Sequence, residues 1–382
     1  MKNNQAKQFA AWLRQHWKLT ILFVLIAIYP YIDSYLQRAS NYSIGGYTGS
    51  LVTVLMYAML ALGLNVVVGY AGLLDLGYAA FFAIGAYAMA LLSTPHPAWG
   101  TGVPFPFNYF WIAMILAAGI ALLSGVILGT PTIPLRGDYL AIVTLGFGEI
   151  VPVVFRNITC ITIPLLNINC LNITDGEKGV QLIALPTIPA LGTFNKIDLA
   201  PWYWLALIII ILAIVFNHRL EHSRLGRAWM AMREDEDAAA AMGIDVVHTK
   251  LLAFAMGATF SGFAGAYYAS YIQAVFPSSF DFTVSVTVLC AVVLGGSGNP
   301  YGAILGGIVI AGVDRIGLGL LTDNVGNFIP FLSGVNFQLW RYGLFGLALA
   351  IVMLVRPEGL LPSAARAREF HEAEEEEAIS GP

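Results

Sequence analysis

The residues of this sequence that could carry out chemistry are concentrated in one charged interval, which runs from Arg219 to Lys250. Arginines open the interval, four consecutive carboxylates follow at 234–237, and an alanine-rich stretch then ends at Gly243. Alanine favours a helix and glycine ends one, so this order predicts a short, stiff surface helix. Its arginines and carboxylates could pair with opposite charges across a polar interface. We therefore expect a soluble partner to dock on this interval.

Elsewhere the sequence offers little for catalysis. All six histidines fall in expected loops or tails, so no apolar run could hold a His-rich metal or haem site. No Gly-x-x-x-x-Gly-Lys-Ser/Thr phosphate loop occurs, so any ATP that powers this protein must be bound by another polypeptide. We expect no enzyme activity, no catalytic residue, no metal and no cofactor in this chain. The histidines are His16, His96, His218, His222, His248 and His371.

The composition indicates which solvent surrounds most of the chain. The 382 residues are 58% hydrophobic and 11% charged, and the mean hydropathy is +0.74. So few charges cannot cover a water-soluble protein of this size, which predicts a polytopic membrane protein in contact with lipid. The formal net charge of -4 comes largely from an acidic tail at 371–377, which we expect to be disordered. Nothing in the charge balance indicates a nucleic-acid partner.

Ten apolar runs approach the length of about 20 residues that a membrane-spanning helix needs. They predict an all-α membrane protein of about ten transmembrane helices. The third and eighth runs adjoin glycine-rich breaks and are expected to be half-helices or re-entrant segments. The runs are Leu19 to Ile32, Leu51 to Val68, Leu76 to Leu92, Phe110 to Leu128, Tyr139 to Phe155, Trp202 to Phe216, Leu251 to Tyr271, Phe282 to Leu294, Ala303 to Leu321, and Leu339 to Val355.

Lysine and arginine are distributed unevenly between the two sides of such a topology. Positive loops are retained in the cytoplasm, so the distribution predicts that both termini and the interval 219–250 are cytoplasmic. The protein would then be a multi-pass protein of a prokaryotic plasma (inner) membrane. Its expected regions are a cytoplasmic segment 1–18, a transmembrane domain 19–355 and an acidic cytoplasmic tail 356–382. The first run could instead be a signal peptide, but no convincing cleavage site follows it, so we favour an uncleaved anchor.

The largest extracytoplasmic segment, 156–201, is rich in Thr, Asn, Pro and Gly and has no helical pattern, which predicts an irregular cap over the outer mouth. Cys160 and Cys170 lie in it, where a disulfide between them and two free thiols are both possible. The third cysteine, Cys290, falls in an apolar run and is expected to pack there.

Two glycine-rich breaks and a few ionisable residues are candidates for the transport path or its hinges. Paired interruptions in two halves of a transporter often mark the binding site, although tight turns between spans explain these glycines equally well. Charge within a membrane is costly and needs a reason. Glu149 could face the path, bind a partner helix or brace the interior, and Asp314 with Arg315 could neutralise each other. The candidates are Gly69, Gly72, Asp75, Glu149, Gly295 and Gly298.

Several motifs carry a resemblance to a known family. Asp237 to Gly243 fits the acidic-Ala-Ala-x-x-x-Gly pattern of coupling loops in importer permeases powered by ATP-binding-cassette (ABC) subunits, without the downstream Ile-x-Leu-Pro of some members; an ordinary basic inner loop is the alternative. From about residue 50 to 362 the chain closely resembles LivM-type permeases of branched-chain amino acid ABC importers. The extracytoplasmic segment and the acidic tail fit that pattern poorly. The matching stretches are 69–77, 81–87, 135–150, 223–229, 233–236, 295–302 and 356–362.

The resemblance implies partners and roles. It implies a homologous LivH-type permease, two ABC ATPase subunits and an extracytoplasmic substrate-binding protein, together moving branched-chain or other neutral amino acids. The alternatives are a permease for urea or short amides and an ion-coupled secondary carrier, which would transport without other subunits. The residues expected to couple the chain to the ATPase are Arg224, Arg227, Arg233, Glu234, Asp237 and Gly243.

Overall fold

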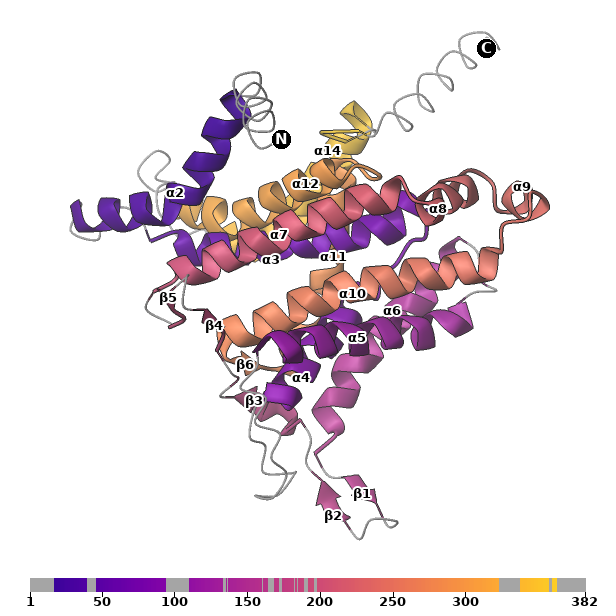
Figure 1. The fold of residues 1–382 in the computed structure, drawn as a ribbon, viewed down its shortest axis with the longest axis horizontal. Coiled ribbons are helices and arrows are strands. Elements are labelled where there is room, and N and C mark those ends of the chain that lie inside the picture. Colours follow the sequence, from indigo (N-terminus) through magenta and orange to yellow (C-terminus); the bar gives the residue numbers. More distant parts are fainter. Residues whose placement is uncertain are drawn as a thin grey trace, which may run out of the picture.

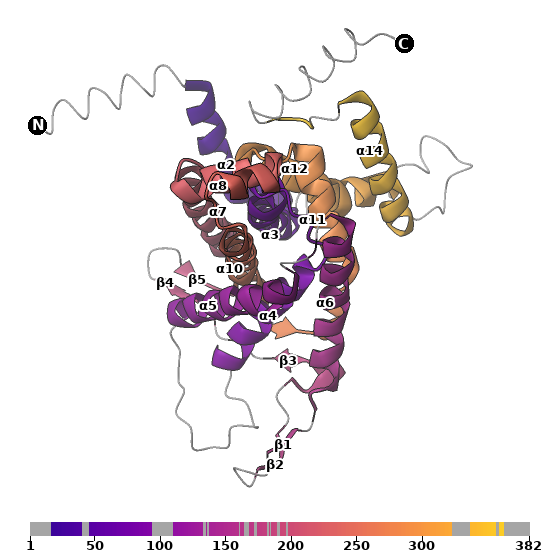
Figure 2. The same cartoon turned by 90° about the vertical axis from the view of Figure 1, so that its right-hand side faces the viewer.

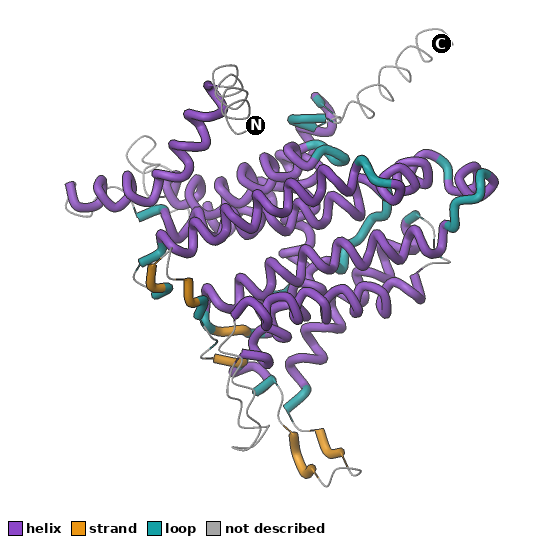
Figure 3. Tube along the Cα trace, viewed as in Figure 1, coloured by secondary structure: helices purple, strands orange, loops and turns teal. Residues whose placement is uncertain are grey.

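The protein is helical almost throughout its described part (Figures 1 and 3). Each of the ten apolar runs coincides with a helix, which confirms the all-α expectation. This computed structural model describes residues 17–39, 46–93, 110–132, 135, 137–159, 161–163, 168–171, 174–181, 183, 185–188, 192–195, 198–322, 337–356 and 359–362. The main helices are α2 (Trp17–Ala39), α3 (Thr48–Leu64), α4 (Tyr78–Ser93), α5 (Phe110–Gly129), α6 (Asp138–Asn157), α7 (Ala200–Glu221), α10 (Val246–Ile272), α11 (Phe282–Gly295), α12 (Pro300–Gly312) and α14 (Arg341–Val355).

Seven helical segments among the described residues are both long enough and apolar enough to cross a membrane. Two of them include a π-helical turn, because α3 continues into η1 (Asn65–Tyr70) and α12 into η7 (Val313–Gly317). The helices α4 and α14 are apolar but shorter. The chain is therefore a multi-pass membrane protein with seven candidate full-length crossings among its described residues, and the expected total of about ten stays a prediction.

The third and eighth runs form short helices, as the glycine-rich breaks predict. The helix α4 has 16 residues, and α11 has 14 and reaches spanning length only together with the turn at 277–279. Both begin inside the bundle: the buried backbone N–H of Ala79 donates to Ser285 Oγ at 2.9 Å, and Tyr78 donates its hydroxyl to the carbonyl of Gly257 in mid-α10. The N-termini of the two short helices therefore meet in the interior.

The helix α10 lies at the centre and packs against α3, α4 and α5, while α12 packs against α3 and α11 (Figure 2). Small residues allow these close crossings: a Cβ on Gly85 would lie 2.5 Å from Gly262 Cα, and one on Gly125 would lie 2.7 Å from Ala258 Cβ. Large apolar side chains fill the remaining space around α10.

The helix α2 is tied to α3 by one buried carboxylate. Asp33 accepts hydrogen bonds from the backbone N–H groups of Gly46 and Thr48 at 2.9 and 3.1 Å, and from the Thr48 hydroxyl at 2.6 Å. The N–H of Thr48 is one of the groups that the start of α3 leaves without partners, and a negative charge is favourable there. Figure 1 shows that α2 bends; Pro30 lies within it, and proline removes a helical hydrogen bond.

Between the ends of α6 and α7, the described residues of the segment 156–201 form only short elements, as its composition predicts. The strands β1 (Ile161–Ile163) and β2 (Ile168–Leu171) pair antiparallel, β3 (Val180–Gln181) pairs with β6 (Ala274–Val275), and β4 (Thr187–Ile188) pairs with β5 (Gly192–Thr193). Strands β3 to β6 lie at the end of the bundle opposite the charged interval (Figure 1). The predictions for the Cys160–Cys170 pair, for residues 1–16 and for the acidic tail fall outside the residues whose side chains are described.

Candidate functional site: a coupling surface and a polar cavity

The charged interval forms two helices instead of the single one expected. They are α8 (Arg224–Glu234) and α9 (Glu236–Ala241). Asp235 separates them with an extended backbone (φ -154°, ψ 114°), and its carboxylate accepts from the N–H groups of Asp237 and Ala238 at 2.8 and 2.9 Å. An aspartate whose carboxylate accepts from the N–H groups two and three residues ahead caps the start of a new helix. Asp235 therefore ends α8 and starts α9.

Local caps define the remaining ends of this pair. Ser223 accepts from the N–H of Gly226 at the start of α8, and Gly243, with φ +89°, follows the end of α9 as expected. At the start of α10, the N–H and the imidazole of His248 bond to the Asp245 carboxylate and hold the pKa of that group below its usual value. Every turn of the interval is therefore specified by its own residues.

Buried contacts fix the pair to the membrane helices. Trp229 is fully buried and donates from Nε1 to the carbonyl of Thr249 at 2.8 Å. Lys250 is almost fully buried and pairs with Glu236 at 2.7 Å, which connects α9 to α10. Sequence reasoning assigned no role to these contacts. The signal available was a tryptophan within a charged interval and a lysine at the edge of an apolar run.

The six expected coupling residues divide into two groups. Five of them are exposed at the end of the molecule that α8 and α9 form in Figure 1: Arg224, Arg227, Glu234, Asp237 and Gly243. Arg233 instead turns inward, and its Nη1 donates to the carbonyl of Gly69 at 2.8 Å. The first group could meet a partner directly, whereas Arg233 connects α8 to the glycine-rich break after α3.

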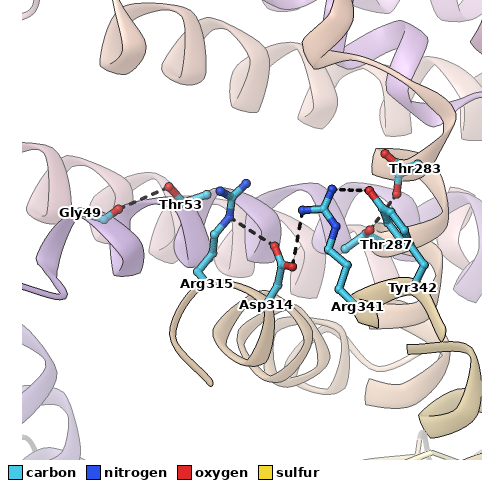
Figure 4. Close-up of polar contacts among 8 residues, drawn as sticks. All are labelled: Gly49, Thr53, Thr283, Thr287, Asp314, Arg315, Arg341 and Tyr342. Atoms are coloured by element: carbon cyan, nitrogen blue, oxygen red, sulfur yellow. Dashed lines mark hydrogen bonds and ion pairs between the residues drawn. The ribbon is translucent and has the colours of Figure 1, made fainter. Parts of the chain in front are cut away.

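A cavity of about 330 Å³ lies between α3, α11, η7 and α14. Hydroxyl groups and charges line much of it, although its walls come from apolar runs. Figure 4 shows Arg315, Asp314 and Arg341 side by side, with Thr53 of α3 on one side and Thr283 and Thr287 of α11 on the other. The volume is at the lower end of the range of about 300–1,000 Å³ for small-molecule sites.

The charges of this cavity share one central carboxylate. Asp314 Oδ2 lies 3.4 Å from Arg315 Nε, and Asp314 Oδ1 lies 3.8 Å from Arg341 Nη1. The expected mutual neutralisation of Asp314 and Arg315 is thus confirmed, with Arg341 as a third member. The Arg341 guanidinium also lies 4.6 Å from the centre of the Tyr342 ring and donates to its hydroxyl. Sequence reasoning did not connect Arg341 with this pair.

Comparison with known proteins identifies the family. Residues 46–354 match the family described as branched-chain amino acid transport system / permease component. The chain belongs to this family. It is 36% identical over 328 residues to the high-affinity branched-chain amino acid transport system permease protein LivM of Salmonella typhimurium, covering 81% of this chain and 68% of that protein. The resemblance to LivM-type permeases is confirmed.

Other relatives agree. LivM of Escherichia coli is 35% identical over 370 residues, which cover 92% of this chain and 76% of that protein. The permease protein LivH of Salmonella typhimurium is more distant, with 23% identity over 322 residues that cover 80% of this chain and 91% of that protein. No solved structure matches the chain.

Stretches of this branched-chain permease that lie far apart in sequence meet behind α8. The buried Asn65 accepts from the N–H of Gly298 at 2.8 Å, and a Cβ on Gly69 would lie 2.2 Å from Asn65 Oδ1. A Cβ on Gly72, where φ is +69°, would lie 2.7 Å from Arg233 Cγ. Three of the candidate hinge glycines and Arg233 thus form one junction, which we call the glycine junction.

The stretch after α14 packs on the same region of the permease. The N–H groups of Leu360 and Leu361 donate to the carbonyls of Leu294 and Gly295, both at 2.9 Å. A Cβ on Gly296 would lie 2.5 Å from the carbonyl oxygen of Leu361. Gly295 therefore belongs to a tight contact between α11, α12 and the chain after α14, adjacent to the glycine junction.

Asp75 and Glu149 lie elsewhere in the permease. Asp75 is buried and accepts from the N–H of Gly77, in the stretch that packs on Thr144 of α6. Glu149 is exposed on the outer face of α6, so its interpretation as an internal brace is wrong. A single sequence does not record which of these side chains the neighbouring helices cover.

Among the described residues, two histidines lie in helices instead of the loops expected: His248 in the first turn of α10, and His218 near the end of α7. His218 belongs to the last turn of α7 and is not in a loop, because the helix continues to Glu221. With Glu221 and His222 it forms a group whose potential ligand atoms lie within 4.8 Å of one another. Both histidines are exposed, and residues at such spacings on a helix end meet without any bound ion.

Proposed function

We propose that this chain is the membrane permease subunit of an ABC importer for branched-chain amino acids. Family membership and the LivM relatives support the transporter class and the substrate. The exposed α8–α9 pair supports the coupling role. Its buried contacts attach it to α10 and to the glycine junction. The subunit has no catalytic activity of its own in this proposal.

The partners follow from this role. A LivH-type permease completes the membrane part, two ATPase subunits bind the α8–α9 end, and an extracytoplasmic binding protein delivers the substrate. The basic residues of the interval support a cytoplasmic position for α8 and α9 and for both termini. The strands β3 to β6 are then extracytoplasmic, because they lie at the opposite end (Figure 1).

The mechanism is a mechanical coupling. Closure of the ATPase dimer displaces α8 and α9. Trp229 and the Glu236–Lys250 pair transmit this displacement to α10, and Arg233 transmits it to the Gly69 carbonyl. Because α10 packs against α4 and α5, a shift of α10 reaches the short helices that begin inside the bundle. The pathway between the two permeases opens and closes as a result.

Charge reversal at Asp237 tests this coupling. Asp237 is exposed on α9, and like charges brought together at an interface cost several kcal/mol. In the reconstituted importer, Asp237→Lys should lower both leucine uptake and the ATPase activity stimulated by the loaded binding protein at least about tenfold, equivalent to ~1.4 kcal/mol. The control Glu177→Lys, which reverses an exposed carboxylate at the opposite end, should keep both. Full retention of both activities by Asp237→Lys would contradict the coupling role.

Experiments on the same reconstituted importer distinguish it from a secondary carrier and from a urea permease. ATPase subunits that co-purify with the chain support the importer, whereas uptake by the chain alone in liposomes under an ion gradient would indicate a secondary carrier. A panel of branched-chain and other neutral amino acids and urea then defines the substrate. Transport of urea in preference to leucine would replace the substrate assignment while keeping the ABC class.

A further inference from the structure

The cavity between α3, α11, η7 and α14 holds charges in a place where charges are expensive. Asp314 and Arg315 lie within the candidate span 300–322, and Arg341 begins α14; ionisable side chains in such segments usually mark a transport path or pair with one another. Here two guanidinium groups share a single carboxylate. The cavity therefore contains more positive charge around Asp314 than pairing alone requires.

The ion pairs of the cavity are loose. Their N···O distances of 3.4 and 3.8 Å exceed the distance of about 2.7–2.9 Å typical of charge-assisted hydrogen bonds. The side chains of Arg315 and Arg341 are 45% and 41% exposed, and that of Asp314 is 13% exposed. A guanidinium has five N–H donors, and these contacts satisfy only some of them. Both arginines can thus receive an anionic group without leaving the carboxylate.

The rest of the lining suits a molecule with two poles and an aliphatic part. A second carboxylate, Asp281, lies on the wall with the hydroxyl groups of Thr283 and Thr287, so the ionisable lining balances two positive against two negative groups. Apolar side chains complete the surface: Met56, Ile272, Val284 and Phe345. A simple anion would bring a further negative charge next to two carboxylates, and a purely apolar ligand would cover the four charges without offering any of them a polar contact.

We infer that this cavity is a transit site for a zwitterionic aliphatic amino acid. The guanidinium groups of Arg315 and Arg341 receive its carboxylate, Asp314 receives its ammonium group, and the apolar wall receives its side chain. The inference rests on the proposed function and identifies where in this chain the substrate passes. Because each cavity charge already has a partner in the empty state, the substrate only exchanges one set of pairs for another. Such an exchange gives weak binding, which suits a site that must release its ligand.

Cysteine protection on the complete transporter tests the inference. Thr287→Cys on α11 and Thr53→Cys on α3 are placed separately on opposite walls, in a chain whose Cys160 and Cys170 are serine; Cys290 is buried and stays. Proteoliposomes are treated from outside with a membrane-impermeant methanethiosulfonate reagent. Millimolar leucine should slow modification of both cysteines at least threefold. The skeleton analogues 4-methylpentanoate, which lacks the ammonium group, and 3-methylbutylamine, which lacks the carboxylate, should protect less than half as well.

Substitutions of the charged residues complete the test. Arg341→Gln and Asp314→Asn should each abolish protection by leucine, Arg341→Lys should retain part of it, and Arg156→Gln, at the exposed end of α6, should retain all of it. Protection that persists in Arg341→Gln and Asp314→Asn, modification that leucine does not affect, or cysteines that never react would overturn the inference and leave the charges as a structural brace.

Uptake of leucine by the unmodified transporter with its binding protein is measured in parallel. Uptake without protection would overturn only the transit site. Absence of uptake would instead overturn the proposed function, and the transit site with it.

Discussion

At the scale of single residues, the contact between Lys250 and Glu236 is the one on which the position of α9 depends most. The lysine is almost fully buried, so removing its partner leaves a charge without compensation in a dry environment. Breaking such a pair from one side costs about 3–5 kcal/mol, whereas removing both charges together is often close to neutral.

We therefore expect Glu236→Gln to weaken the attachment of α9 to α10 by about 3–5 kcal/mol. Hydrogen exchange at 236–250 should become faster, while exchange in α5 should stay unchanged. The double variant Glu236→Gln with Lys250→Met should recover most of the protection. If the single and double variants exchange equally fast, the pair does not hold the helix in place.

The sequence predicts that the charged interval forms a helical surface element, but it does not predict which residues its side chains contact. The alanines, the arginines and Gly243 predict a helical surface element, and the structure contains one. The inward turn of Arg233 depends on the carbonyl of Gly69, which lies 164 residues away along the chain. Such long-range pairs are set by the packing of α3 against α10, and a single sequence does not record that packing.

At the scale of elements, the glycine junction connects α8 to the break after α3. Gly72 has φ +69°, a conformation that is costly for residues with a side chain, and an added Cβ would meet Arg233 Cγ at 2.7 Å. The junction therefore leaves no room for a methyl group without a shift of either α8 or the chain at 71–77.

We expect Gly72→Ala to impair coupling more than folding. The substitution should lower the ATPase activity stimulated by the loaded binding protein at least about tenfold, because α8 is displaced from the Gly69 carbonyl, while the amount of assembled transporter falls less than twofold. Gly119→Ala is the matched control: a Cβ at Gly119 of α5 meets no atom within 4 Å, so activity should be unchanged. Normal stimulation in Gly72→Ala would show that the junction does not transmit the displacement.

The positions of the helices were predictable, because apolar length is a property of the sequence itself. All ten runs became helices, and the breaks at Gly69–Gly77 and Gly295–Gly302 marked the two short ones. The break between α8 and α9 was not predicted, since alanine propensity favours one helix and the Asp235 cap overrides it. The cavity was missed for a different reason: Arg341 follows Asp314 by 27 positions, and only the packing of α14 brings them together.

At the scale of the whole molecule, one surface is incompatible with a chain that stands alone in lipid. The helix α6 presents Tyr139, Ile142, Ile150 and Val153 outward, and Glu149 lies on this outer side near the middle of the helix. A carboxylate at that depth is costly in lipid, and an apolar face of this kind is what a second permease would cover. Gly146 leaves open space on the same side, which permits close approach of another helix.

We therefore expect Glu149 to contact the LivH-type partner. Glu149→Leu should lower recovery of that permease with the tagged chain, because losing one member of a buried polar pair costs about 2–5 kcal/mol. The chain itself should stay folded, since Glu149 is exposed in it and leucine is favourable in lipid. The control Glu177→Leu removes an exposed carboxylate in the segment 156–201 and should leave recovery unchanged. If Glu149→Leu keeps its partner but loses leucine uptake, Glu149 faces the path instead, and the two permeases meet on a different face.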